Sequence, residues 1–216
     1  MISPVATSPT QPDPTPRDEG PRPAYPYYWT RFGPDGERTV PGQDLAALRR
    51  GIGRGPMEAP EMWRFYCRID DRGTVSPALR AEHAALGLFG VHQQSQLRLM
   101  HWQGVPLGQA LRVLRDSGRY SEAALDRRVT QAATANDLEE MVHHLRGLVT
   151  MLKSVPTPQG LDYSRLVNDL IAWQHPDRVG RVRRDWGRHY FHPTTPSDRS
   201  AGSRQPTSTT APSKEI

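Results

Sequence analysis

The stretch 161–191, LDYSRLVNDLIAWQHPDRVGRVRRDWGRHYF, decides the fold class because two helical patterns meet in it at His175-Pro176. Apolar and aromatic residues of the second pattern recur every three or four positions, so they line one face of a helix. These residues are Val179, Val182, Trp186 and Tyr190, and the arginines with the same spacing elsewhere on the helix are Arg181, Arg184 and Arg188. A helix with a buried apolar face and a row of exposed arginines favours a polyanionic partner.

The helical pattern extends upstream from this stretch to Gln43, and helix-start signals divide it into separate helices. Such signals are Ser or Asp at the N-cap and Pro in the first turn. They occur at Ser76-Pro77, Pro106, Ser121 and Asp162, and Asn136 to Glu139 has the form of a capping box. No run of alternating residues requires a strand. We therefore predict an all-α protein, a single bundle of about seven or eight helices.

Two of the predicted helices have the apolar pattern of core helices. The helix after Pro77 is apolar nearly all round, which predicts a central position. Its apolar residues include Ala81, Ala85, Leu86, Leu88 and Phe89. The helix from Asn136 has one amphipathic stripe, formed by Leu138, Met141, Val142, Leu145, Leu148, Val149 and Leu152.

The two ends of the chain contrast with this body. Residues 1–24 and 193–216 are rich in Pro, Ser and Thr, so we predict disordered tails. Residues 25–42 contain five aromatics before a Gly-Pro-Asp-Gly turn, and the sequence leaves open a short helix or an extended arm that docks on the body. The helical domain is then 43–192, and it carries the net charge of +5.

The residue types argue against an enzyme, a cofactor site and a membrane protein. The eight histidines include no His-Asp pair, and His143-His144 point about 100° apart on a helix, so we expect no metal site. Gly51 to Gly55 lacks the lysine of a phosphate loop and is predicted to be a turn in which glycine adopts positive φ. Cys67 is predicted to be a buried thiol in a reducing, cytoplasmic compartment. The longest nearly apolar run, 84–91, is too short to cross a bilayer.

Arginine is the main remaining signal, because lysine occurs only at Lys153 and Lys214. Arginine binds phosphate through a planar fork of donors. Asp177 and Asp185 each lie four residues from Arg181, which predicts exposed ion pairs for that arginine. The predicted nucleic-acid-binding residues are Arg49, Arg50, Arg54, Arg127, Arg128, Arg146, Arg181, Arg184 and Arg188. Trp173, Trp186 and Tyr190 could stack on bases, but their helical spacing favours the core.

An ordered set of short motifs between Gln43 and Phe191 resembles the CasB family, the small subunit of the type I-E CRISPR Cascade complex. The motifs are LRRGIGR (48–54), HQQS (92–95), MH and GVPLG (100–108), HLRGLV (144–149), LDY (161–163), AWQ (172–174) and VRRDWGR (182–188). Each motif alone is weak, and the ordered set is specific.

The resemblance implies a non-catalytic, all-helical subunit that pairs head to tail with a second copy along a guide-RNA complex. It would contact the backbone and large subunits, crRNA, and the target and displaced DNA strands, without a small-molecule substrate. Arg49 and Arg50, Arg127 and Arg128, and Arg146 match arginine positions of the family. Alternatives are a free helical DNA-binding regulator, disfavoured by the poor start Asp-Arg-Val-Gly for a recognition helix, and a helical hydrolase, for which a ligand set is missing.

Overall fold

The computed structural model describes residues 26–33, 39–69 and 73–192. Within them the regular elements are seven α-helices and three 3₁₀ helices, and the only β interaction is an isolated parallel bridge between His101 and Leu161. The α-helices are α1 Gly42–Arg50, α2 Pro77–Gln93, α3 Leu107–Asp116, α4 Glu122–Thr134, α5 Leu138–Ser154, α6 Tyr163–Trp173 and α7 Val179–Phe191. The 3₁₀ helices are η1 Tyr28–Phe32, η2 Pro56–Glu58 and η3 Pro60–Phe65. The all-α prediction is confirmed.

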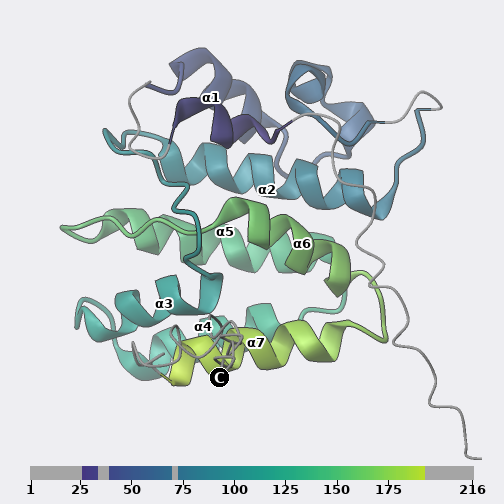
Figure 1. Ribbon diagram of the computed structural model, residues 1–216. Helices are drawn as coiled ribbons and strands as arrows, with labels where there is room; N and C mark the ends of the chain where they lie inside the picture. Colours follow the sequence, from purple (N-terminus) through teal and green to yellow (C-terminus); the bar gives the residue numbers. More distant parts are fainter. Residues whose placement is uncertain (1–25, 34–38, 70–72, 193–216) are drawn as a thin grey trace, which may run out of the picture.

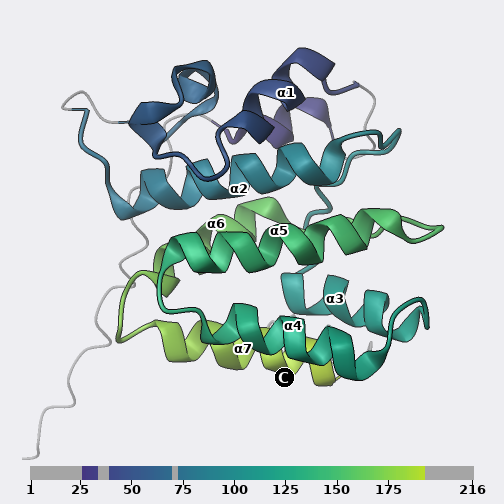
Figure 2. The ribbon, with the colours of Figure 1, turned by 180° about the vertical axis from the view of Figure 1, so that it is seen from behind.

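The helices stack in layers, with α2 near the middle (Figures 1 and 2). α1 and the 3₁₀ helices cover one side of α2, and α5 and α6 cover the other. α3, α4 and α7 form the outer layer beyond α5 and α6, with α4 against α5 and α7 against α3 and α6. On the side seen in Figure 2, α1, α2, α5 and α4 follow one another from top to bottom.

α2 is the central helix that its apolar pattern predicts. All residues from Ala81 to Gln93 are buried, because neighbouring helices pack against α2 on both sides. Its start follows the predicted signal: Ser76 is the N-cap, its hydroxyl accepts the Leu79 N–H at 3.1 Å, and Pro77 occupies the first turn. α1 approaches closely over Gly90, where a Cβ atom would lie 2.7 Å from Cβ of Leu48.

The other predicted helix starts are confirmed, with one shift in register. α3, α4 and α6 begin directly after Pro106, Ser121 and Asp162. The predicted capping box at Asn136 and Glu139 is wrong by one residue. The N-cap is Asp137, whose carboxylate accepts the Glu140 N–H at 2.8 Å, while the Glu140 carboxylate accepts the Asn136 N–H at 2.8 Å. An aspartate fits the N-cap as well as an asparagine does, so composition alone could not fix the register.

The N-terminal segment, which the sequence left open, packs into the core as the 3₁₀ helix η1. Trp29 is fully buried, and its indole N–H donates to the Ser164 hydroxyl of α6 at 3.0 Å. Tyr27, Tyr28 and Phe32 are buried beside it. The predicted tails 1–24 and 193–216 lie outside the described residues.

The prediction of helix throughout the body is wrong for two links. Residues 51–76 hold 3₁₀ helices, turns and irregular segments in their described parts, and residues 94–106 form an irregular loop. The glycine turn after α1 is confirmed at Gly53, whose φ is +81°. Gly51 instead has a helical φ of −72° and is needed for close packing, because a Cβ there would collide with the Met62 sulfur.

Candidate nucleic-acid interface

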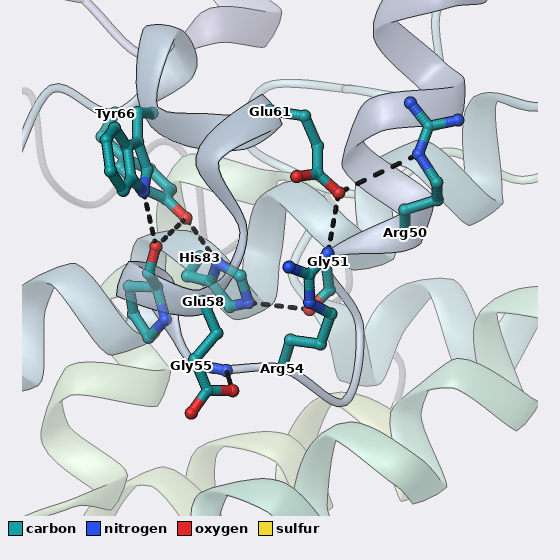
Figure 3. A network of polar contacts seen from close by, with 10 residues as sticks. Arg50, Gly51, Arg54, Gly55, Glu58, Glu61, Tyr66 and His83 are labelled. Carbon is teal, nitrogen blue, oxygen red and sulfur yellow. Dashed lines mark hydrogen bonds and ion pairs between the residues drawn. The ribbon is translucent and has the colours of Figure 1, made fainter.

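At the glycine turn after α1, two of the predicted arginines share one carboxylate. Arg54 donates to Glu61 at 2.9 Å, and Arg50 lies 3.9 Å from the same oxygen (Figure 3). A hydrogen bond from its own backbone and the Arg54 guanidinium lower the pKa of Glu61. Part of the positive charge of Arg50 and Arg54 is therefore already compensated within the chain.

A buried histidine anchors this turn to α2. His83 lies 2.9 Å from the Gly51 carbonyl through Nε2 and 2.6 Å from the Tyr66 hydroxyl through Nδ1 (Figure 3). Burial lowers the pKa of His83, so the ring is neutral, with Nε2–H donating to the carbonyl and Nδ1 accepting from Tyr66. Sequence reasoning gave this histidine no role, because the contact partners lie 17 and 32 residues away.

Arg49, also at the end of α1, lies against α2 and near the end of α5. A Cβ at Gly90 of α2 would lie 3.4 Å from Cγ of Arg49. Lys153 of α5 donates to two carbonyls at the end of α2, Val91 at 3.1 Å and Gln94 at 3.4 Å. Burial, and secondly the charge of Arg49, lower the pKa of Lys153. Two cations from α1 and α5 are therefore close together.

The positive charge continues along α5 to α4. Arg146 and Lys153 are seven residues, about two turns, apart and therefore share one face of α5. Arg128 of α4 adjoins this face, because a Cβ at Gly147 would lie 3.9 Å from its Nη1. We call Arg49, Arg128, Arg146 and Lys153 the α5 surface; they lie on the helices at the front of Figure 2.

The α5 surface differs from the glycine turn in having no internal counter-charge. Across residues 26–33, 39–69 and 73–192, no carboxylate forms an ion pair with any of its four members. Arg127 is also exposed and has no ion pair with a described residue, but it is about 100° around α4 from Arg128. Sequence reasoning missed Lys153, although its spacing from Arg146 could have identified it.

The arginines of α7 belong to a separate surface, since α7 packs against α3 and α6. Arg181 and Arg184 are exposed, whereas Arg188 pairs with Asp185 at 3.3 Å. The predicted ion pairs of Arg181 are wrong. Asp185 faces Arg165 of α6 instead, and Asp177 precedes the start of α7 at Val179, so the helical spacing that the prediction assumed does not apply to it.

Trp173, Trp186 and Tyr190 of the opening stretch are core residues, as predicted. Trp173 and Trp186 are buried and stacked, with ring centroids 5.7 Å apart. The Trp186 indole donates to Asp169 at 2.7 Å, and the buried Tyr190 hydroxyl donates to Asp126 of α4 at 2.6 Å. None of the three rings is therefore free to stack on a base.

The described residues give little support to a metal site, a reactive thiol or a membrane span. They contain no group of three or more His, Cys, Asp or Glu that could hold a metal ion. The Cys67 thiol donates to the buried Glu82 carboxylate at 2.9 Å, and burial raises the pKa of Cys67, so it is not a thiolate at neutral pH. In the same described segments, no helix is long and apolar enough to span a bilayer.

Comparisons of the sequence and of the structure with known proteins point to the same family. The sequence family described as CRISPR-associated protein Cse2 matches residues 44–191. CasB from Thermobifida fusca is 31% identical, with a TM-score of 0.56 over 69% of this chain and 84% of that one. A Cse2-family protein from Thermus thermophilus is 21% identical, with a TM-score of 0.56 over 76% of this chain and 92% of that one, and therefore supports the fold alone.

CasB from M. ruber likewise supports the fold, at 22% identity and a TM-score of 0.53 over 78% of this chain and 93% of that one. No curated protein matches the chain. The family match covers more than half of the chain, and the Thermobifida fusca protein shares both its fold and nearly a third of its aligned sequence. The chain therefore belongs to the CRISPR-associated Cse2 (CasB) family.

Proposed function

We propose that this chain is the non-catalytic small subunit of a type I-E CRISPR Cascade complex. In this proposal the α5 surface binds nucleic-acid phosphates and stabilises the R-loop formed by guide RNA, target strand and displaced strand. The observation that carries the proposal is the convergence of Arg49, Arg128, Arg146 and Lys153 from three helices without an internal counter-charge. Family membership supplies the biological setting.

A surface of this kind suits R-loop stabilisation for a physical reason. Exchange of a DNA duplex for an RNA–DNA heteroduplex is nearly balanced in free energy, so a few added backbone contacts shift it toward the open state. Arginine contacts to phosphate release condensed counterions and require no particular base sequence. A sequence-independent cationic surface therefore serves every target that the guide selects.

The predicted arginines differ in how much of their charge is free to bind phosphate, because some of them already form ion pairs within the chain. Arg49, Arg128 and Arg146 have their full charge available, followed by the exposed Arg127, Arg181 and Arg184. Arg50, Arg54 and Arg188 would have to leave a carboxylate partner before they could bind phosphate. We therefore expect the latter three to contribute less.

The proposal includes the partners that the assembly requires. They are the backbone and large Cascade subunits, a second copy of this chain, crRNA, and the target and displaced DNA strands, in the cytoplasm. The reconstituted complex should retain this chain together with guide RNA on size-exclusion chromatography. Elution of the chain alone, with no affinity for the other subunits, would show that it acts as a free protein.

The sharper experiment measures R-loop formation by complexes that carry Arg49→Glu, Arg128→Glu or Arg146→Glu. The matched control is Arg119→Glu, because Arg119 is exposed, has no ion pair with a described residue and lies between α3 and α4, outside the α5 surface. Each test variant should weaken target binding by about three- to tenfold and make the salt dependence shallower by about one unit of log–log slope. Unchanged binding by all three would refute the role of this surface.

A further inference from the structure

A second cationic site lies at the opposite end of the bundle from Arg49. There the starts of α2, α5 and α7 meet the end of α6 around a cavity of about 430 Å³. We call this cavity the helix-start groove; the starts of α2 and α7, which contribute to its lining, lie at the right-hand side of Figure 1. Its volume is within the range of about 300–1,000 Å³ that is usual for binding pockets.

The walls of the groove are held in place by direct contacts. The Gln174 amide at the end of α6 donates to the Pro77 carbonyl at the start of α2, at 2.8 Å. The Asp137 carboxylate caps the start of α5. The guanidinium of Arg183 lies 4.9 Å from the centre of the Trp173 ring, which orients this arginine from α7 toward the end of α6. The groove is thus formed by residues already fixed within the folded chain.

Hydrogen-bond donors in the groove lack partners. Arg80 of α2 and Arg183 of α7 are exposed and form no ion pair with any residue that the structure describes. The indole N–H groups of the other four tryptophans each donate to an oxygen, whereas that of Trp173 has no hydrogen-bond partner among the described residues. Arg80, Arg183 and Trp173, which carry these donors, line the same cavity, and such donors favour an anionic acceptor.

The rest of the lining is largely apolar. Leu138 and Val179 are half-buried next to Trp173 and contribute side chains to the cavity. A ligand that fits must therefore combine a carboxylate or phosphate with an apolar group. In a protein segment this combination is an acidic residue beside Leu, Ile, Val or Phe.

Nucleic acid fits the helix-start groove less well than an acidic peptide does. The Trp173 ring is only 6% exposed and is already in contact with Trp186 and Arg183, so it offers no face for a base. Asp137 also lines the groove, but its carboxylate already accepts the Glu140 N–H at 2.8 Å, and the two arginines outnumber it. Since α2 has 17 residues, the groove lies about 25 Å from the end of α2 near Arg49.

We propose that the helix-start groove binds an acidic segment of a protein partner, in which a Glu or Asp carboxylate lies beside an apolar side chain. The carboxylate pairs with Arg80 and Arg183 and accepts the Trp173 indole N–H, and the apolar side chain packs on Leu138 and Val179. The inference is independent of the R-loop role, because it uses no residue of the α5 surface.

The experiment is a titration of the ¹⁵N-labelled full chain with a short peptide that contains Leu-Glu-Glu-Leu between Gly and Ser residues. We expect saturable binding that shifts the indole resonance of Trp173. The same peptide with Gln in place of Glu should bind at least about tenfold more weakly, because it cannot form charge-assisted hydrogen bonds. Equal binding of the two peptides, or no binding of either, would overturn the proposal.

Variants locate the site. The double variants Arg80→Glu/Arg183→Glu and Arg80→Gln/Arg183→Gln should both lose peptide binding, with the Gln pair as the milder change if charge reversal disturbs folding. Arg119→Glu should bind like the unaltered chain. Binding that survives in both double variants, or displacement of the peptide by a short single-stranded DNA, would contradict an acidic-peptide site. Neither result bears on the R-loop measurements with Arg128→Glu and Arg146→Glu.

Discussion

At the scale of single residues, two acids, the buried Glu82 and the half-buried Asp169, are compensated by different hydrogen bonds. Glu82 is fully buried, and its carboxylate accepts the N–H groups of Cys67 and Arg68, each at 2.9 Å, together with the Cys67 thiol. Asp169 accepts the Trp186 indole at 2.7 Å, and burial raises the pKa of Asp169 to about 6. The charge of Asp169 is therefore costly in the folded state.

Asp169→Asn should stabilise the protein at neutral pH. A folded-state pKa above the ordinary aspartate value means that folding is favoured while the group is protonated, and this advantage is lost as pH rises through about 6. Asparagine keeps an oxygen that can accept the Trp186 N–H but carries no charge, at the cost of losing the attraction of Arg165.

The measurement is urea unfolding at several pH values. The gain in unfolding free energy should be roughly 1–3 kcal/mol at pH 8 and should vanish near pH 4. Asp116→Asn on the exposed end of α3 serves as control and should show no such rise with pH. A gain that is independent of pH would mean that the charge of Asp169 is not its cause.

At the scale of elements, close helix packing depends on particular glycines. α3 and α7 approach each other at Gly108, where a Cβ would collide with the Trp186 carbonyl oxygen and lie 2.9 Å from Cβ of His189. At Gly187 of α7, by contrast, an added Cβ meets nothing within 4 Å. The same substitution should therefore have opposite effects at the two positions.

Gly108→Ala should lower the unfolding free energy by about 1–3 kcal/mol, because backbone atoms of α7 must move. Gly187→Ala should raise it by roughly 0.5–1 kcal/mol, since alanine loses less conformational entropy in a helix. Chemical denaturation of both variants checks the pair. Destabilisation by Gly187→Ala would show that α7 has a neighbour on that face in solution.

At the scale of the whole molecule, the segment before α1 is part of the core. Trp29 contacts Phe89 of α2, with ring centroids 5.8 Å apart, and Tyr163 of α6 at 5.5 Å. Through its bond to Ser164 it also connects the start of the chain to residues 135 positions away. The fold thus depends on a residue that lies outside the family match at 44–191.

Trp29→Ala should lower the unfolding free energy by about 3–5 kcal/mol, as expected for removal of a large buried aromatic side chain. Trp63→Ala is the matched control, because Trp63 is 46% exposed, and it should cost far less. Thermal and urea unfolding of the two variants make the comparison. Similar losses for both would mean that the N-terminal segment does not pack as described.

Helical periodicity explains which parts of this architecture the sequence predicts. Burial of Val182, Trp186 and Tyr190 against exposure of Arg181 and Arg184 follows from a repeat of about 3.6 residues within one helix. Start signals located α2, α3, α4 and α6 for the same local reason. The register of α5 was missed, because Asn136 and Asp137 are both good N-cap residues.

The sequence by itself determined the all-α class, the buried face of several helices and the resemblance of an ordered set of motifs to one family. Only the tertiary structure decided which arginines lie close together and which are paired with a carboxylate. It places Arg49 near Lys153, Arg128 beside α5, and Arg50 and Arg54 on Glu61. The physical reason is that periodicity describes one helix at a time, whereas the relative position of helices depends on close packing over Gly90 and Gly108 between residues distant in the chain.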